Sequence, residues 1–409
     1  MLSHKLHSLI SDIVSATDND LHNNCKGNNS TSPQETKMAG KAEGLSSAAA
    51  AGGASLIVIP RAELHAFVVR SLEKVGAKTS HARDLADLLV AADYRGHFSH
   101  GLNRLELYMM DLVTKFVAVD AEPEIVKETV ATALVNGNNL CGPVVGKFSM
   151  DLAIKKAREA GIGWVTCKGS NHFGIAGYYS IRAMEQGLLG MAFTNTSPKL
   201  VPTRAYTQTL GTGPISVSAP ANNGDSMDLD MATTVVALGK VEVKNTLQEQ
   251  IPLGWGVDTE GKPTTDPKIV IGDGGLMPLG GAEETSGYKG YGLGLMVEVF
   301  CGILSGSTFG PFIRQMALHE GVADLGHCFV ALDPEAFAPG FTDRMSTLLD
   351  HCRNLEPAEG ESEVLVPGDP ERQHMAMCDK LGGIPYKPKQ IEWADNLAAQ
   401  HGVQPLKRL

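Results

Sequence analysis

Apolar side chains recur at helical spacing along the first clearly patterned part of the chain, from about residue 56. A helix is predicted wherever such positions repeat every three or four residues, because they then share one face. One set spans residues 64–72 and a second spans 85–92, with Ser80 expected as the N-cap of the second helix. We therefore expect residues 56–127 to be mainly helical.

Further along, short apolar runs alternate with helical stretches. The stretch 151–160 ends at Gly161, a residue type that commonly terminates helices. Strands interleaved with helices indicate an α/β domain, which we place at residues 128–309. Beyond it the chain returns to helical and loop character, so residues 310–409 are assigned to the helical domain together with 56–127. The runs predicted as strands are 130–135, 163–167, 189–194 and 215–219.

Residues 1–55 carry mostly small and polar side chains, which bury little apolar surface on folding. They are predicted to form a disordered N-terminal extension. The sequence leaves open whether translation starts at Met1 or at Met38, and what the extension does.

The composition mainly excludes classes of protein. The 409 residues carry a formal net charge of -11 and no basic cluster, which argues against nucleic acid as a partner. No apolar run is long enough to span a membrane, and the N-terminus lacks the apolar core of a signal peptide. Seven cysteines without a Cys-x-x-Cys pair fit neither a zinc site nor a disulfide framework. We expect a cytoplasmic protein with no metal and no membrane partner.

The richest chemistry lies in residues 99–108. If this segment is helical, His100, Arg104 and Tyr108 lie on one face, about 6 Å apart along the axis at each step. An imidazole that exchanges protons, beside a guanidinium that binds carboxylates, suits an enzyme acting on a small carboxylate substrate. The alternative is an ordinary solvated helix face.

His172 is a second candidate. It follows the predicted strand 163–167 and precedes a helix, and ligands of α/β sheets bind at the carboxyl ends of strands. Its imidazole can exchange protons near neutral pH, although a structural histidine bonded to the backbone remains the alternative. Polar loops at 194–198, 210–215 and 228–234 offer hydroxyl and N–H groups suited to phosphates and riboses, but ordinary turns use the same residues.

Three familiar signatures are incomplete. Segment 256–262 resembles a phosphate-binding loop, but Pro263 replaces the required Ser or Thr, so we predict a surface turn. The glycine-rich stretch 287–294 is followed by Val297 where a dinucleotide fingerprint needs its last glycine. Ser99 lacks the preceding strand that a nucleophile elbow requires.

Taken together, these segments resemble the malate/L-lactate dehydrogenase family of the non-Rossmann type. That family also contains ureidoglycolate and sulfolactate dehydrogenases and cyclic imino-acid reductases. The resemblance extends over roughly residues 57–370. The motifs that carry it, in order, are residues 95–101 with Arg104 and Tyr108, then 170–174, Thr194-Asn195, Gly211-Thr212, 230–233 and 288–292.

The resemblance implies hydride transfer between NAD or NADP and a small 2-oxo or 2-hydroxy acid, with malate-type substrates foremost. It also implies a mixed-sheet, non-Rossmann nicotinamide-binding domain packed on a mainly helical domain, and a homodimer. The residue roles that it implies are acid/base catalysis for His172, with His100 and Ser99 in the same catalytic pocket; substrate binding for Arg104 and Tyr108; and cofactor binding for Thr196, Asp230, Met231, Ala232, Lys289 and Gly290.

Two departures leave the cofactor-binding mode open. Gly213 stands where similar proteins usually have Asn, and residues 202–206 lack paired glycines. Arg204 adds a charge for a dicarboxylate or a 2′-phosphate, or is a surface residue. Reduction of a cyclic imine (Δ1-piperideine- or pyrroline-2-carboxylate) and a non-catalytic, metabolite-binding role are the competing functions. NAD versus NADP, the substrate side chain and the physiological direction stay open.

Overall fold

The computed structural model describes residues 56–315 and 321–409. The predicted disordered extension and both candidate start positions therefore lie outside the described residues. Within the two described ranges, no helix combines the length and the apolar character needed to cross a membrane.

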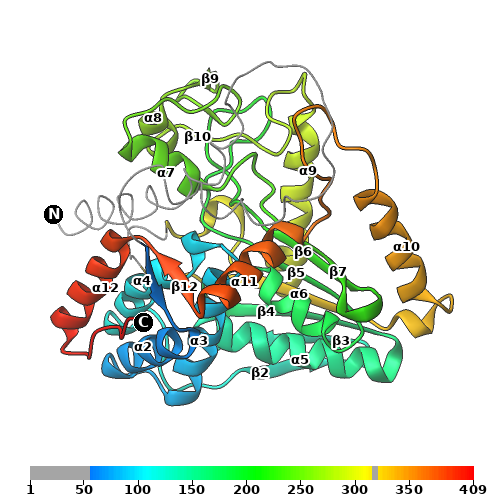
Figure 1. Ribbon diagram of the computed structural model, residues 1–409, viewed down its shortest axis with the longest axis horizontal. Coiled ribbons are helices and arrows are strands. Elements are labelled where there is room, and N and C mark those ends of the chain that lie inside the picture. The colour runs from blue at the N-terminus through cyan, green and yellow to red at the C-terminus, as the bar shows by residue number, and fades with distance from the viewer. Residues whose placement is uncertain (1–55, 316–320) are drawn as a thin grey trace, which may run out of the picture.

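A seven-stranded mixed sheet forms the centre of the molecule (Figure 1). Only β3 and β4 run parallel, and the helix α5 (Gly142–Ala160) connects them; every other neighbouring pair is antiparallel. An ordinary dinucleotide-binding sheet is parallel, so the predicted mixed, non-Rossmann α/β fold is confirmed. In spatial order the strands are β2 (Glu124–Glu128), β3 (Thr132–Asn136), β4 (Ile162–Ser170), β11 (Leu325–Leu332), β5 (Leu189–Thr194), β6 (Ile215–Pro220) and β7 (Ser226–Met231).

The strand β11 corrects the sequence analysis, which expected helix and loop after residue 309. It lies in the middle of the sheet, paired with β4 on one side and β5 on the other. Residues 325–331 are all buried, so the strand has no polar face and lacks the alternation that identifies half-buried strands. Residues 325–332 thus belong to the central sheet rather than to the helical part.

Helices cover both faces of this sheet. On β4, Trp164 packs edge-on against Phe300, whereas Val165, which points the opposite way, joins the core beneath α5. Phe300 belongs to the π-helical turn η4 (Val299–Ile303) that continues α9 (Gly287–Glu298). The helix α6 (Gly177–Met184) lies beside α5 and contacts β5 and β6. The end of α5 at Gly161, in the left-handed conformation, confirms the predicted helix stop.

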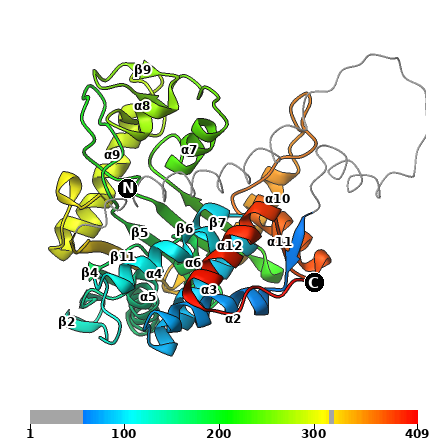
Figure 2. The ribbon, with the colours of Figure 1, turned by 90° about the vertical axis from the view of Figure 1, so that its left-hand side faces the viewer.

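A helical layer packs on the outer side of α5 and shares its apolar core (Figure 2). The short strands β1 (Ile57–Ile59) and β12 (Ile384–Tyr386) pair with each other and bring the two ends of the described chain together. The helix α3 begins at Thr79, so Ser80 lies in its first turn and is not the N-cap. The helices of this layer are α2 (Arg61–Lys74), α3 (Thr79–Tyr94), α4 (Leu105–Val113) and α12 (Pro388–His401).

Two further parts surround the sheet. The helices α10 (Phe341–Arg353) and α11 (Asp369–Leu381) follow β11, in line with the helical character expected there. A small lobe contains α7 (Leu238–Thr246), α8 (Pro267–Ile271) and a separate sheet of β8 (Gly256–Val257), β9 (Pro263–Thr264) and β10 (Gly275–Leu276). The segment that resembles a phosphate-binding loop forms the turn between β8 and β9, as predicted.

Residues 99–108 do not form the single helix that their spacing predicts. They form two short 3-10 turns, η1 (Phe98–His100) and η2 (Leu102–Arg104), before α4 begins. The two turns meet at Gly101, whose ψ of -134° departs from helical geometry. The stripe of polar residues is therefore built by a folded loop and the start of a helix.

A buried carboxylate explains this break. Asp93 accepts hydrogen bonds from the backbone N–H of Leu102 at 2.8 Å and from the hydroxyl of Tyr386 at 2.6 Å. Its carboxyl group fills the space that a Cβ at position 101 would need, so only glycine fits there. Burial raises the pKa of Asp93 to about 7. The loop with Ser99 and His100 is thus fixed to the helical layer and to β12.

Candidate active site

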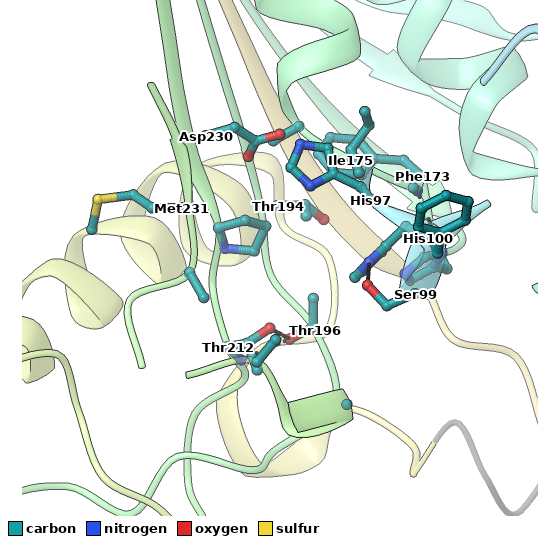
Figure 3. Close-up of a pocket in the computed structure, with 18 of the residues that line it drawn as sticks. His97, Ser99, His100, Phe173, Ile175, Thr194, Thr196, Thr212, Asp230 and Met231 are labelled. Atoms are coloured by element: carbon teal, nitrogen blue, oxygen red, sulfur yellow. Dashed lines mark hydrogen bonds between the residues drawn. The ribbon is translucent and has the colours of Figure 1, made fainter. Parts of the chain in front are cut away.

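The carboxyl ends of three strands meet at one edge of the sheet. Both β4 and β5 run antiparallel to β11, and β7 is related to β5 through two antiparallel pairings, so all three point the same way. A cavity of about 350 Å³ opens at this edge (Figure 3). Residues after all three strands line it, together with the loop 96–100 and the start of α7. This is the position in which α/β sheets bind ligands.

His172 lies in the loop after β4 and is surrounded by the predicted stripe. Its Nδ1 is 2.6 Å from the hydroxyl of Tyr108 and 3.3 Å from the backbone N–H of Gly174. The ring of His100 stacks on it, with centroids 5.8 Å apart. His172 and His100 line the cavity, whereas Tyr108 does not: it contacts His172 from behind. The structure thus gives Tyr108 a contact with the imidazole, and its role in substrate binding stays a prediction.

The electrostatics of the site keep both imidazoles neutral. Burial, reinforced by the nearby positive charge of Arg104, lowers the pKa of His172 to about 3. Burial, followed by the charges of Arg104 and His172, holds the pKa of His100 well below its usual value. Burial also raises the pKa of Tyr108, which therefore keeps its proton. At neutral pH the site combines neutral proton-exchanging groups with one fixed cation.

Arg104 does not line the cavity itself but lies next to residues that do, Ser99 and the two imidazoles. Its Nε donates to the backbone carbonyl of Ser99 at 2.7 Å, which fixes the guanidinium. Its two terminal nitrogens have no hydrogen-bond partner in the described part of the chain. The hydroxyl of Ser99 contacts Nδ1 of His100 at 2.9 Å, as the dashed line in Figure 3 indicates. A carboxylate bound to Arg104 would lie next to both imidazoles.

The opposite side of the cavity suits a nicotinamide dinucleotide. Asp230 accepts a hydrogen bond from the N–H of Gly177 at 2.7 Å, and its other carboxyl oxygen has no partner among the described residues. Burial raises its pKa to about 6. That oxygen suits a ribose hydroxyl, while the N-terminus of α7 and the exposed Lys240 suit phosphates. The hydroxyl of Thr196, which accepts from the N–H of Thr212 at 3.0 Å, offers another polar contact.

The structure brings most of the predicted cofactor residues together, but not all. Thr196, Asp230, Met231 and Ala232 line the cavity. The sequence analysis predicted a polar loop over residues 228–234. Residues 228–231 instead belong to strand β7.

Lys289 and Gly290 do not line the cavity of their own chain. Lys289 is exposed in the first turn of α9, and Gly290 is buried where a Cβ would collide with the backbone of Leu279. Close packing between α9 and the preceding loop therefore explains why position 290 is a glycine.

Several lining residues escaped the sequence analysis as site residues. His97 lines the cavity and lies 3.6 Å from Glu371 of α11, a contact between distant segments that no local pattern reveals. The start of α7 carried no motif either. Thr212 and Pro214 lay within a polar loop that was noted but not assigned. The lining residues that were not predicted as site residues are Gly96, His97, Phe98, Phe173, Gly174, Ile175, Ala176, Thr194, Thr212, Pro214, Ala237, Gly239, Lys240 and Leu325.

A neutral imidazole with an unpaired guanidinium beside it, at a cavity on the carboxyl ends of the strands, fits one class of protein: nicotinamide-dependent dehydrogenases of small 2-hydroxy acids. A sequence model of the family described as malate/L-lactate dehydrogenase matches residues 59–393. The chain belongs to this family, and the resemblance inferred from the motifs is confirmed.

Relatives agree along nearly the whole described chain. The malate dehydrogenase of Pyrococcus horikoshii is 38% identical over 354 residues, which cover 86% of this chain and 97% of the relative. The solved structure of malate dehydrogenase from Entamoeba histolytica matches with a TM-score of 0.81 and 30% identity, covering 86% and 99% of the two chains. The structure of Δ1-piperideine-2-carboxylate reductase from Pseudomonas syringae matches with a TM-score of 0.75 and 27% identity, covering 83% and 99%.

Replacing Tyr108 by phenylalanine tests the contact with His172. We expect kcat to fall at least about tenfold, because the ring loses the only side-chain hydrogen bond that the described residues give it, while KM for the hydroxy acid changes less than about threefold. Steady-state kinetics at saturating cofactor measure both constants. The matched control is Tyr94→Phe, which removes an exposed hydroxyl bonded to Asp379. A rise in KM alone would instead assign Tyr108 to substrate binding.

The low pKa of His172 predicts that kcat/KM for oxidation does not fall on the acidic side of neutral pH. In its predicted role as the base, His172 must be neutral to accept the proton of a hydroxy acid, and a pKa of about 3 keeps it neutral throughout the assay range. We expect kcat/KM for oxidation to show no limb from His172 between about pH 5 and pH 8. Asp230→Asn is the control, because Asp230 titrates at about 6. A limb near 6.5 that persists in this variant would contradict the assignment.

Proposed function

We propose that the protein interconverts malate and oxaloacetate, or a closely similar acid pair, with NAD or NADP. The observation that carries the proposal is a neutral imidazole, His172, in the cavity lining, with the unpaired guanidinium of Arg104 close behind that lining. Malate dehydrogenases that are 38% and 39% identical over most of the chain support the malate-type substrate. The nicotinamide ring, when bound, supplies the hydride acceptor or donor.

Arg104 orients the substrate in this mechanism. Its terminal nitrogens bind the carboxylate in a two-point contact, while its Nε stays anchored to Ser99. Because the guanidinium is held in place, the neighbouring hydroxyl or carbonyl carbon is presented to the imidazole in one orientation. Stacked His100 keeps water from the side of His172 that it covers.

His172 exchanges the proton through Nε2, since Nδ1 is occupied by Tyr108. In oxidation the ring receives the hydroxyl proton; in reduction it returns that proton to the carbonyl oxygen. When Nε2 is the base, Nδ1 carries the other ring proton in both charge states and donates it to the hydroxyl oxygen of Tyr108, so this contact persists when the ring gains its proton. The contact thus maintains the orientation of His172 through the whole cycle.

Substrate binding also changes the basicity of His172. In the free enzyme the charge of Arg104 opposes protonation of the imidazole. A bound carboxylate neutralises this charge, so the pKa of His172 rises once the substrate is in place. Proton uptake is therefore coupled to binding of the acid that is to be reduced.

Reduction of a cyclic imino acid is the second candidate. The guanidinium of Arg104 would bind the carboxylate of the imino acid. The structural similarity to a piperideine-carboxylate reductase supports this candidate. Its identity of 27% is lower than that of the malate dehydrogenases, so it ranks second.

A substrate panel with a catalytic variant tests both functions. We expect oxidation of NADH or NADPH with oxaloacetate, and a loss of about 10²–10⁴-fold in kcat in His172→Ala, with dinucleotide binding retained. His65→Ala, which removes an exposed histidine paired with Asp87, is the control. Turnover of Δ1-piperideine-2-carboxylate alone would move the function to imine reduction. Turnover of neither, with the dinucleotide bound, would favour a non-catalytic role.

We also propose that the protein is a homodimer formed through the exposed face of α9 and η4. Four apolar side chains recur on this face at helical spacing, and such a stripe favours burial against a partner. Lys289, expected at the cofactor but outside its own cavity, lies on the same helix. The four residues are Tyr288, Leu295, Val299 and Ile303.

Sedimentation tests the dimer. We expect twice the chain mass for the wild-type protein and a shift to monomer in Val299→Glu, because a charge would be buried in the interface. Val130→Glu is the matched control, since Val130 is 70% exposed in the turn between β2 and β3. A dimer that persists in Val299→Glu would place the interface elsewhere.

A reducing compartment such as the cytoplasm completes the proposal. The six cysteines in the described residues are all unpaired, and five of them are buried. Unpaired buried thiols are typical of proteins in reducing surroundings.

A further inference from the structure

A buried histidine joins three strands at the edge of the sheet that carries the cavity. His327 lies on the central strand β11 and is fully buried. Its Nδ1 is 2.7 Å from the hydroxyl of Thr194, the last residue of β5, and its Nε2 is 2.7 Å from the hydroxyl of Ser170, the last residue of β4. The imidazole therefore connects the ends of the two strands on either side of its own.

The contacts of this imidazole lead to the lining of the cavity. Thr194 lines the cavity itself, and Ser170 lies two residues before His172. The ring of Phe173, which also lines the cavity, stacks on the ring of His327 with centroids 4.7 Å apart. Thr194 and Phe173 are both labelled at the cavity in Figure 3. His172 is thus held between two residues, at positions 170 and 173, that His327 contacts.

Only one direction of hydrogen bonding fits this arrangement. Burial lowers the pKa of His327 to about 3, so its ring is neutral and carries one N–H donor and one acceptor nitrogen. The hydroxyl of Thr194 lies 2.9 Å from the carbonyl oxygen of Asn195, which can only accept, so the hydroxyl donates its proton there. Thr194 then accepts from Nδ1 of His327, and Ser170 donates to Nε2. This order fixes the tautomer of the ring and the orientation of both hydroxyl groups.

The backbone ladder does not make this connection. The strands β4 and β5 are not neighbours, because β11 lies between them. The pairing of β11 with β4 shifts register between Leu325 and His327, and such a shift locally disrupts the ladder hydrogen bonds. A polar side chain buried here costs free energy unless its polar atoms are bonded, whereas an apolar one would simply fill the space. The two hydrogen bonds of His327 therefore join the strand ends in addition to filling the core.

We propose that His327 is a positioning residue, which holds the loop of His172 in register with the cavity wall at Thr194. His327 does not line the cavity itself, so it acts through the residues that it contacts. Thr194 lies two residues before Thr196, which offers a polar contact on the cofactor side. The proton-exchanging imidazole and the cofactor side of the cavity thus keep one relative position. This inference rests on the proposed function, because His172 must be the group that exchanges the proton.

The kinetics of two variants test this role. His327→Phe keeps an aromatic ring for the stack and removes both hydrogen bonds, whereas Ser170→Ala removes one of them with little change in volume. We expect kcat for reduction of oxaloacetate, per bound dinucleotide, to fall about 10–10²-fold in His327→Phe and less in Ser170→Ala, because a displaced catalytic group slows the reaction. KM for oxaloacetate should change less than about threefold, since carboxylate binding is not altered. His81→Phe is the control, because His81 is also buried but lies in α3, outside the cavity lining.

Hydrogen exchange in the free protein gives a second readout, which needs neither turnover nor dinucleotide. The Nδ1–H proton of His172, which donates to Tyr108, is identified by NMR through its loss in His172→Ala. We expect this proton to exchange with water at least about tenfold faster in both variants, while the backbone amides of α12 keep their wild-type rates. His81→Phe should leave the exchange at His172 unchanged.

The outcomes that contradict the role of His327 are separate from those that contradict the function. Wild-type kcat in a variant that binds the dinucleotide, or a loss confined to KM, would overturn the proposal. Unchanged exchange at His172 would also overturn it, as would an equal acceleration in α12, which indicates general destabilisation. Failure of the proposed function shows as wild-type protein that turns over no 2-oxo acid, and the exchange experiment then still decides the role of His327.

Discussion

The hydrogen bond between Tyr108 and His172 is the point at which the helical layer and the sheet jointly build the site. His172 comes from the loop after β4, and Tyr108 comes from α4, 64 positions earlier in the chain. Neither segment alone orients the imidazole. Buried beside Arg104, the ring is neutral, and in the proposed mechanism its pKa rises when a carboxylate neutralises the guanidinium. Packing between layers is therefore also the means by which the chemistry is tuned.

A buried carboxylate makes this packing specific. Asp93 holds the N–H of Leu102 and the hydroxyl of Tyr386, which belongs to the last strand of the chain. Through it, the loop that carries Ser99 and Arg104 depends on both ends of the described structure. Glycine at position 101 is the local requirement of that arrangement. The substrate side of the cavity is thus stabilised by residues far from it in sequence.

The chain's local patterns predicted much of the fold and the site, and long-range contacts account for what they missed. Strand β5 and the helix stop at Gly161 follow from hydrophobic periodicity and glycine chemistry. Strand β11 does not, because burial on both faces removes its alternation. The four-residue spacing correctly grouped His100, Arg104 and Tyr108, but for the wrong reason, since Asp93 breaks the helix. The contact of His97 with Glu371 had no local signal, because Glu371 lies on α11, far along the chain.

The central place of β11 has a consequence for how the protein is made. Strands β4 and β5 do not pair with each other; each pairs with β11, which is synthesised more than 130 residues after β5. During translation, the edges of β4 and β5 that pair with β11 therefore stay unpaired until β11 has left the ribosome. Unpaired strand edges are prone to aggregation. His172 and Thr196 reach their final separation only when that segment emerges. The edge of the sheet that carries the cavity is thus completed late in synthesis. Until then the strand edges are exposed, a state in which a chaperone would limit aggregation.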